Sequence, residues 1–99
     1  MAISLIMNFE GMKQDKYDGI MRELGLKVGS QNPENWPHGI ISHQAGSTPS
    51  GWSVVDVWET QADFDKFMQS RLSPAFKKVG GIGEPRVTTV QLYNRFVGK

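Results

Sequence analysis

The sequence predicts an α+β fold whose elements follow the order β-α-β-β-α-β. Four segments have the alternating or β-branched apolar pattern of strands, and two have apolar residues at helical spacing. A short turn rich in Gly, Ser, Thr and Pro, residues 46–50, separates the second and third strands and indicates a hairpin. We expect one domain over residues 1–99, because the chain is too short for a second core.

The first strand is expected over residues 2–9, where every second residue is apolar. A helix is then expected over residues 13–24, because apolar residues recur at i, i+3, i+4 and i+7. Gly25 is placed to end this helix as a C-cap. Its start is less well marked, since neither Met12 nor Lys13 offers a side-chain oxygen for capping. The polar loop that follows, residues 28–37, has the composition of a rim or lid.

The hairpin is expected to consist of a strand over residues 39–45 and a return strand over residues 51–60. If Gly46 pairs with Gly51, His43 lies opposite Val54 and on the same face as Asp56. A shift of one residue would move His43 to the other face. We therefore expect His43 and the strand carboxylate Asp56 to share a face.

The second helix is expected to begin at Thr60, which is followed by an acidic residue at N3. Ser73 and Pro74 are expected to interrupt it, with Ser73 capping a new helical segment and Pro74 at its first position. The last strand is expected over residues 86–96.

This order, with two crossover helices and one hairpin, predicts a ferredoxin-like βαββαβ fold with a four-stranded antiparallel sheet. Both helices should cover one face of the sheet. The other face would then expose apolar residues, among them Ile6, Val57 or Trp58, and Tyr93. We expect a second copy to cover it, giving a two-fold homodimer formed sheet against sheet.

Composition excludes several classes of function. The net charge of +1, from 11 basic and 10 acidic residues spread along the chain, gives no patch for nucleic acid or an anionic membrane. No apolar run approaches the roughly 20 residues that cross a bilayer, and no secretory signal is recognisable, so a cytoplasmic protein is expected. There is no cysteine for a disulfide or a thiolate nucleophile.

No cofactor and no metal site are expected. The glycine-rich segment 80–83 does not follow a strand and open a helix, as a dinucleotide-binding loop does. The two histidines have no carboxylates clustered near them at metal-ligand spacing in the sequence.

His43 and Asp56 are the candidate catalytic residues. His43 could act as a general base or as a donor to a substrate oxygen, or it could be a core histidine bonded to its neighbours. Asp56 could orient His43 and stabilise its imidazolium. Alternatively it could be a structural partner of Arg71, Arg22 or a backbone donor, since a buried carboxylate needs a partner.

Four further residues are candidates for substrate binding. Tyr17 could point its hydroxyl into a pocket or lie in the core, and Trp58 could be a pocket wall or a core filler. Asn8 could hydrogen-bond a substrate or only end its strand. Arg71 could bind an anionic group or form a surface salt bridge.

The chain resembles the dimeric α/β-barrel superfamily, and in particular its antibiotic-biosynthesis monooxygenase-like proteins. The resemblance covers nearly the whole chain and is carried by residues 10–12, Gln14 with Tyr17-Asp18, 43–46, 51–59, Phe64 with Phe67, and 71–75 without residue 73. One departure is Lys13, where such sequences often have a capping Ser or Thr. The resemblance implies a dimer and a ligand cavity in each subunit between helices and sheet, bounded here by residues near Tyr17 and Met21 and by Phe64, Phe67 and Met68. The helix after Thr60 lacks the histidine that haem-degrading members carry, so haem is not expected.

These observations leave two hypotheses for function. The first is a cofactor-independent, monooxygenase-like enzyme acting on a small aromatic or polyketide-like molecule, by proton abstraction followed by oxygenation or rearrangement. In it, His43 and Asp56 are catalytic, and Tyr17, Trp58 and Phe67 are pocket walls. The second is a non-catalytic, small-molecule-binding or stress-related dimer in which the His43–Asp56 pair is structural.

Overall fold

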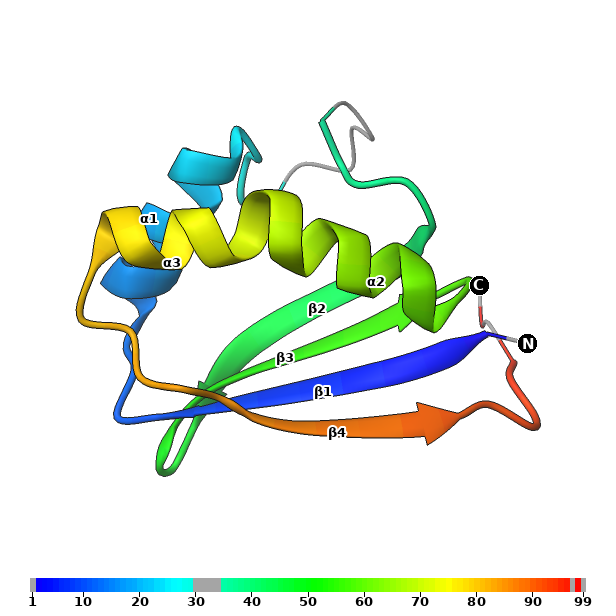
Figure 1. Cartoon of the computed structure of the whole chain (residues 1–99). Coiled ribbons are helices and arrows are strands. Elements are labelled where there is room, and N and C mark those ends of the chain that lie inside the picture. Colours follow the sequence, from blue (N-terminus) through cyan, green and yellow to red (C-terminus); the bar gives the residue numbers. More distant parts are fainter. Residues whose placement is uncertain (1, 30–34, 97, 99) are drawn as a thin grey trace.

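The computed structural model describes residues 2–29, 35–96 and 98, and it confirms the predicted β-α-β-β-α-β order (Figure 1). The four strands form one antiparallel sheet in the order β2-β3-β1-β4, as in ferredoxin-like proteins. The elements are β1 (Ile3–Glu10), α1 (Gln14–Leu24), β2 (Ile40–Thr48), β3 (Gly51–Trp58), α2 (Gln61–Phe67), α3 (Ser73–Val79) and β4 (Arg86–Gln91).

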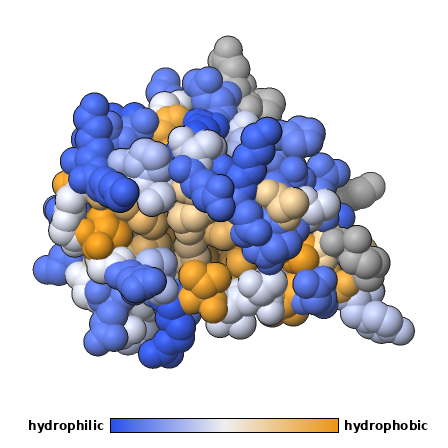
Figure 2. Space-filling model, viewed as in Figure 1, coloured by the Kyte–Doolittle hydropathy of each residue, from blue (hydrophilic) through white to orange (hydrophobic). Residues whose placement is uncertain are grey.

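All helices lie on one face of the sheet, as predicted, and the core fills the space between the two layers (Figure 1). The central strands β1 and β3 turn every second side chain toward the helices, and those side chains are buried. Helix α1 adds its own apolar face, and α2 adds Phe64 and Phe67. Figure 2 shows hydrophilic residues over most of the helical layer, with hydrophobic residues gathered where this layer meets the sheet.

Helix α1 begins and ends as its sequence indicates. Lys13 stands at its N-cap without a side-chain hydrogen bond. Gly25 follows the last turn in the left-handed region, with φ of 74°, and its N–H donates to the carbonyl of Arg22 at 3.1 Å. The first turn of α2 is capped by Thr60, whose hydroxyl accepts from the N–H of Asp63 at 3.1 Å.

The expected cap at Ser73 is wrong, because the chain stays helical through it, although Pro74 does lie in the first turn of a new α-helical segment, α3. One turn of π-helix, Met68–Leu72, joins α2 to α3, and Ser73 itself has helical torsions. Its N–H donates to the carbonyl of Met68, five residues earlier. A proline inside a regular α-helix collides with the carbonyl four residues before it. The wider π turn relieves that collision, so Pro74 no longer forces a new helix start.

The predicted hairpin register is wrong by two residues. Strand β2 runs on to Thr48, which pairs with Gly51, so Pro49 and Ser50 alone form the turn. His43 therefore lies opposite Asp56 and not opposite Val54. An even shift keeps every side chain on its face. The expectation that His43 and Asp56 share a face is therefore confirmed.

The face of the sheet away from the helices carries a mixture of apolar and polar residues. Ile6, Val55 and Val57 lie half-buried there, and Val90 on β4 is 41% exposed. Of the alternatives Val57 and Trp58, Val57 lies on this face, and the expectation for Tyr93 is wrong. Trp58 faces the helices and has no exposed surface, because it belongs to the inward half of the β3 alternation. Tyr93 lies beyond β4, which ends at Gln91 and not at residue 96.

Within the described residues, no helix has the length and apolar character needed to span a membrane.

Leu5 tests this account of the core. It lies in the middle of β1, with no exposed surface, so Leu5→Ala should lower the free energy of unfolding by about 2–5 kcal/mol. Urea denaturation at a fixed protein concentration measures this difference. Val87→Ala is the control, because Val87 is 45% exposed and its truncation should change stability by about 0.5 kcal/mol or less. Equal effects of the two substitutions would contradict the placement of the core.

Candidate functional site

The site is built around Asp56, the one charged residue among the buried side chains of the described chain. It lies in the middle of the central strand β3, on the helix side, and is 4% exposed. Directly opposite on β2, His43 brings its Nδ1 to 2.7 Å from the Asp56 carboxylate. Because a carboxylate only accepts, His43 Nδ1 carries the proton of this hydrogen bond.

Tyr17 extends this hydrogen bond into a relay. Its hydroxyl, on the inward face of α1, lies 2.6 Å from His43 Nε2. With the His43 proton on Nδ1, Nε2 has a free lone pair and accepts from the Tyr17 O–H. The second oxygen of Asp56 accepts from the indole Nε1 of Trp58 at 3.3 Å. We refer to Tyr17, His43 and Asp56 as the relay.

Burial raises the pKa of Tyr17 to about 12 from its ordinary 10.0, with smaller contributions from the negative charges of Asp56 and Asp18. Tyr17 is therefore a neutral phenol near neutral pH. In the relay it is a hydrogen-bond donor to His43 and not a tyrosinate.

A cleft of about 690 Å³ opens beside the relay, between α1 and the β2–β3 hairpin. Tyr17 and Met21 contribute one wall, and His43 and Trp52 contribute the other. Trp36 closes one side, with its ring 5.2 Å from the ring of His43. This volume suits a ligand of one to a few rings.

The loop before β2 is partly on the rim of the cleft, as its composition suggested. Its residues 28, 29, 36 and 37 line the cleft, whereas residues 30–34 of that predicted lid lie outside the described residues.

A second, smaller cavity adjoins the cleft at the relay and extends among core residues. It has a volume of about 50 Å³ and is lined by core residues of α1, the sheet and the second helical segment, together with all three relay residues. A void of this size costs about 1 kcal/mol of stability at roughly 24 cal/mol per Å³.

The remaining predicted site residues lie away from the large cleft. Trp58 and Phe67 are buried in the core with their rings 5.6 Å apart, although Phe67 also lines the small cavity. Asn8 lies on the opposite face of the sheet, where its amide oxygen accepts from Ser53. Arg71 donates to the carbonyl of Leu24 at 2.8 Å and stacks over Phe67, so it stabilises the end of α1 and does not face the cleft.

Asp56 pairs with His43 and Trp58, and not with Arg71 or Arg22. The indole Nε1 of Trp52, by contrast, is buried and has no hydrogen-bond partner among the described residues. Trp52 lines the cleft with other parts of its side chain, because this nitrogen has no accessible surface.

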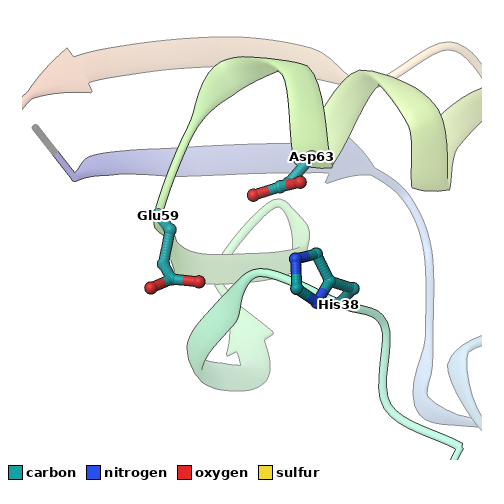
Figure 3. A group of neighbouring side chains, drawn as sticks. All are labelled: His38, Glu59 and Asp63. Atoms are coloured by element: carbon teal, nitrogen blue, oxygen red, sulfur yellow. The ribbon is translucent and has the colours of Figure 1, made fainter.

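The structure also brings together three potential metal ligands that the sequence did not suggest. His38, Glu59 and Asp63 place their ligand atoms within 4.8 Å of one another around one space near the start of α2 (Figure 3). Glu59 and Asp63 are four residues apart, whereas His38 lies about 20 residues earlier and is brought to them where the Glu59 N–H bonds to the Gly39 carbonyl at 2.8 Å. Such a group could hold a cation, but exposed side chains of this kind are also common without one. It lies outside the cleft.

No protein-family model matches the chain, and no curated protein is detectably similar to it in sequence. Solved structures do share its fold. A protein from Deinococcus radiodurans, provisionally named an antibiotic biosynthesis monooxygenase, matches with a TM-score of 0.61 and 10% identity, covering 100% of this chain and 99% of its own. A monooxygenase from Streptomyces coelicolor, in complex with nanaomycin D, matches with a TM-score of 0.56 and 14% identity, over 99% and 92% of the two chains.

A dimeric ferredoxin-like protein from an uncultured marine organism also matches, with a TM-score of 0.56 and 16% identity, over 99% and 91% of the two chains. At such identities these matches establish the fold and not the reaction. The resemblance to antibiotic biosynthesis monooxygenase-like proteins is thus confirmed at the level of the fold.

The pKa of Tyr17 gives a direct test of the relay. The chain has two tyrosines, so Tyr93→Phe leaves Tyr17 as the only source of the tyrosinate absorbance. Its titration should show a midpoint at about 12 in the folded protein and near 10.0 in denaturant. Because the folded state favours the protonated phenol, folding stability should also fall as the pH rises from 10 to 12, and Tyr17→Phe should abolish this part of the loss. A folded-state midpoint near 10.0 would show that the hydroxyl is solvated and not buried against His43.

Proposed function

We propose that the protein is an enzyme that removes a proton from a small aromatic or polyketide-like molecule, as a monooxygenase-like catalyst that uses the relay in place of a cofactor. The observation that carries this proposal is the continuous hydrogen-bond chain from the cleft to the core, 2.6 Å from Tyr17 to His43 and 2.7 Å from His43 to Asp56. A histidine ordered by a buried carboxylate is an arrangement typical of general bases.

The proton moves along the relay in two linked transfers. An acidic O–H or C–H of the substrate gives its proton to the Tyr17 oxygen, while the Tyr17 hydroxyl proton passes to His43 Nε2. The imidazolium that forms is stabilised by the Asp56 carboxylate, which already holds His43 Nδ1–H. The substrate keeps the electron pair, and the resulting anion reacts with dioxygen or rearranges. The proton returns by the reverse path when product forms.

The walls of the cleft support a planar aromatic ligand that also carries polar groups, because Gln14, Asp18 and Lys27 line it beside the aromatic residues. Trp36 and Trp52 present aromatic surface beside the relay. The monooxygenase of similar fold that binds nanaomycin D agrees with this ligand class.

The alternative function is non-catalytic binding, and one observation favours it. Every polar atom of the relay already has a partner within the relay or in Trp58, including His43 Nε2, the nitrogen that a general base must use. In that case the hydrogen bonds of the relay only stabilise the buried Asp56 carboxylate, and the cleft binds its ligand without reaction.

We further propose that the protein is a homodimer joined through the sheet face that the helices leave uncovered. Ile6, Val55, Val57 and Val90 give this face an apolar centre that a monomer would leave in water. The dimeric ferredoxin-like protein of similar fold supports this assembly.

His43→Ala separates the two functions. Loss of a general base should lower the rate of oxygen uptake by about 100-fold or more, while leaving the binding of an aromatic ligand nearly unchanged. Oxygen uptake with a panel of naphthols and dihydroxynaphthalenes measures turnover, and quenching of tryptophan fluorescence by nanaomycin D measures binding. Ser47→Ala is the matched control, because Ser47 lies on the same face of β2 but outside the cleft.

Two results would oppose the catalytic proposal. Wild-type protein that binds nanaomycin D without consuming oxygen with any member of the panel would favour the binding function. Turnover that survives His43→Ala, together with a lower melting temperature, would show that His43 is structural.

Val57→Lys tests the dimer. It places a charge at the centre of the uncovered sheet face, where burial without a partner is costly, so the variant should be monomeric. Light scattering at micromolar concentration should give twice the 11.1 kDa chain mass for the wild type and the single chain mass for the variant. Val28→Lys, at a loop position that is 57% exposed, should remain dimeric. A wild-type mass of one chain would refute the proposal.

A further inference from the structure

We propose that the small cavity at the relay is a binding site for dioxygen, the co-substrate of the reaction proposed above. This inference rests on that proposed function for its chemical role. Its physical basis is separate, because it comes from the size, lining and position of the cavity.

The size of the cavity suits a molecule of two or three heavy atoms. Its volume of about 50 Å³ is several times the roughly 10–15 Å³ that one water needs. Protein interiors contain few voids larger than a water, and each lowers stability. A void kept next to a candidate active site is therefore better explained by an occupant than by loose packing.

The lining of the cavity favours an apolar occupant over water. Apart from Tyr17, His43, Asp56 and the single indole N–H of Trp36, its lining side chains carry no hydrogen-bonding N–H or oxygen. The polar atoms of the three relay residues already bond to one another or to Trp58. A buried water needs two to four polar partners, which these side chains do not offer. Dry apolar cavities bind small apolar molecules, including gases such as xenon.

The position of the cavity connects it to the cleft. Six residues line both spaces, among them Tyr17, Trp36 and His43, so the cavity adjoins the part of the cleft where a substrate would meet the relay. The substrate anion would form beside the Tyr17 hydroxyl, and dioxygen would be held next to it in the adjoining cavity. The substrate carbanion gives one electron pair to dioxygen: a carbon–oxygen bond forms, the π bond of dioxygen breaks, and a peroxide anion results. The relay proton is available to the reduced oxygen.

Val54 allows the cavity to be filled without touching the relay. It lies on β3 next to Trp52 and Asp56 in the inward alternation, is 5% exposed, and lines the cavity but not the cleft. Val54→Ile adds one methylene to a space with room for it and keeps a β-branched side chain. Val54→Ala enlarges the same space. Val87→Ile adds the same group at an exposed position on β4 and is the control.

The test uses xenon as a probe of the cavity and oxygen kinetics as a probe of its role. Xenon titration followed by 129Xe NMR should show binding to the wild type, Val54→Ala and Val87→Ile, and its loss in Val54→Ile. With the naphthol panel, Val54→Ile should raise the KM for dioxygen roughly fivefold or more, with affinity for nanaomycin D unchanged. Val54→Ala should leave that KM close to the wild-type value.

Each contrary result overturns the proposal at a different point. A wild type that binds no xenon shows that the cavity admits no gas. Loss of xenon binding in Val54→Ile with an unchanged KM for dioxygen shows that oxygen reacts from elsewhere. Xenon binding by a wild type that never consumes oxygen removes the co-substrate role because the proposed function has failed, and the xenon result distinguishes that case from the first.

Discussion

The hydrogen bond between Asp56 and His43 is the interaction on which the rest of the site depends. A carboxylate at the centre of a covered strand is tolerated only if it is paired, because leaving such a charge unpaired costs about 3–5 kcal/mol. His43 and Trp58 supply the partners, at 2.7 and 3.3 Å. This requirement favours the register that sets His43 opposite Asp56, and Tyr17 then completes the chain toward the cleft. One buried charge thus couples the alignment of the hairpin to the chemistry of the cleft.

The sequence predicted the order of the elements and the faces of the strands well, because both follow from short-range periodicity. It could not predict the hairpin register, since the segment from Gly46 to Ser50 offers several tight turns of similar composition. The shared face of His43 and Asp56 was recoverable because a two-residue shift preserves the alternation. The π turn before Pro74 could not be predicted, because a Ser-Pro pair is locally typical of a helix start.

The candidate site was only partly predictable, because periodicity gives the face of a residue and not its depth or its distant neighbours. Trp58 and Trp52 share a face, yet one is a core residue and the other lines the cleft. Arg71 was a candidate ligand contact, but its partner is the end of α1, 47 positions away in sequence. His38 and Asp63 meet through a backbone contact at Gly39 that no local pattern announces. Tyr17 could be placed on an inward helix face, but not 2.6 Å from an imidazole.

The π turn at Met68–Leu72 also limits how this chain could change length over evolution. A π turn holds one residue more than the α-helical turn it replaces. Deleting one residue there would restore regular bonding, bring Pro74 back into conflict with the preceding turn, and rotate all of α3 by about 100° about its axis. Ala75, now inward, would leave the core. A related sequence that is shorter by one residue in this helix should therefore also lack the proline. The one-residue deletion and the loss of the proline should occur together.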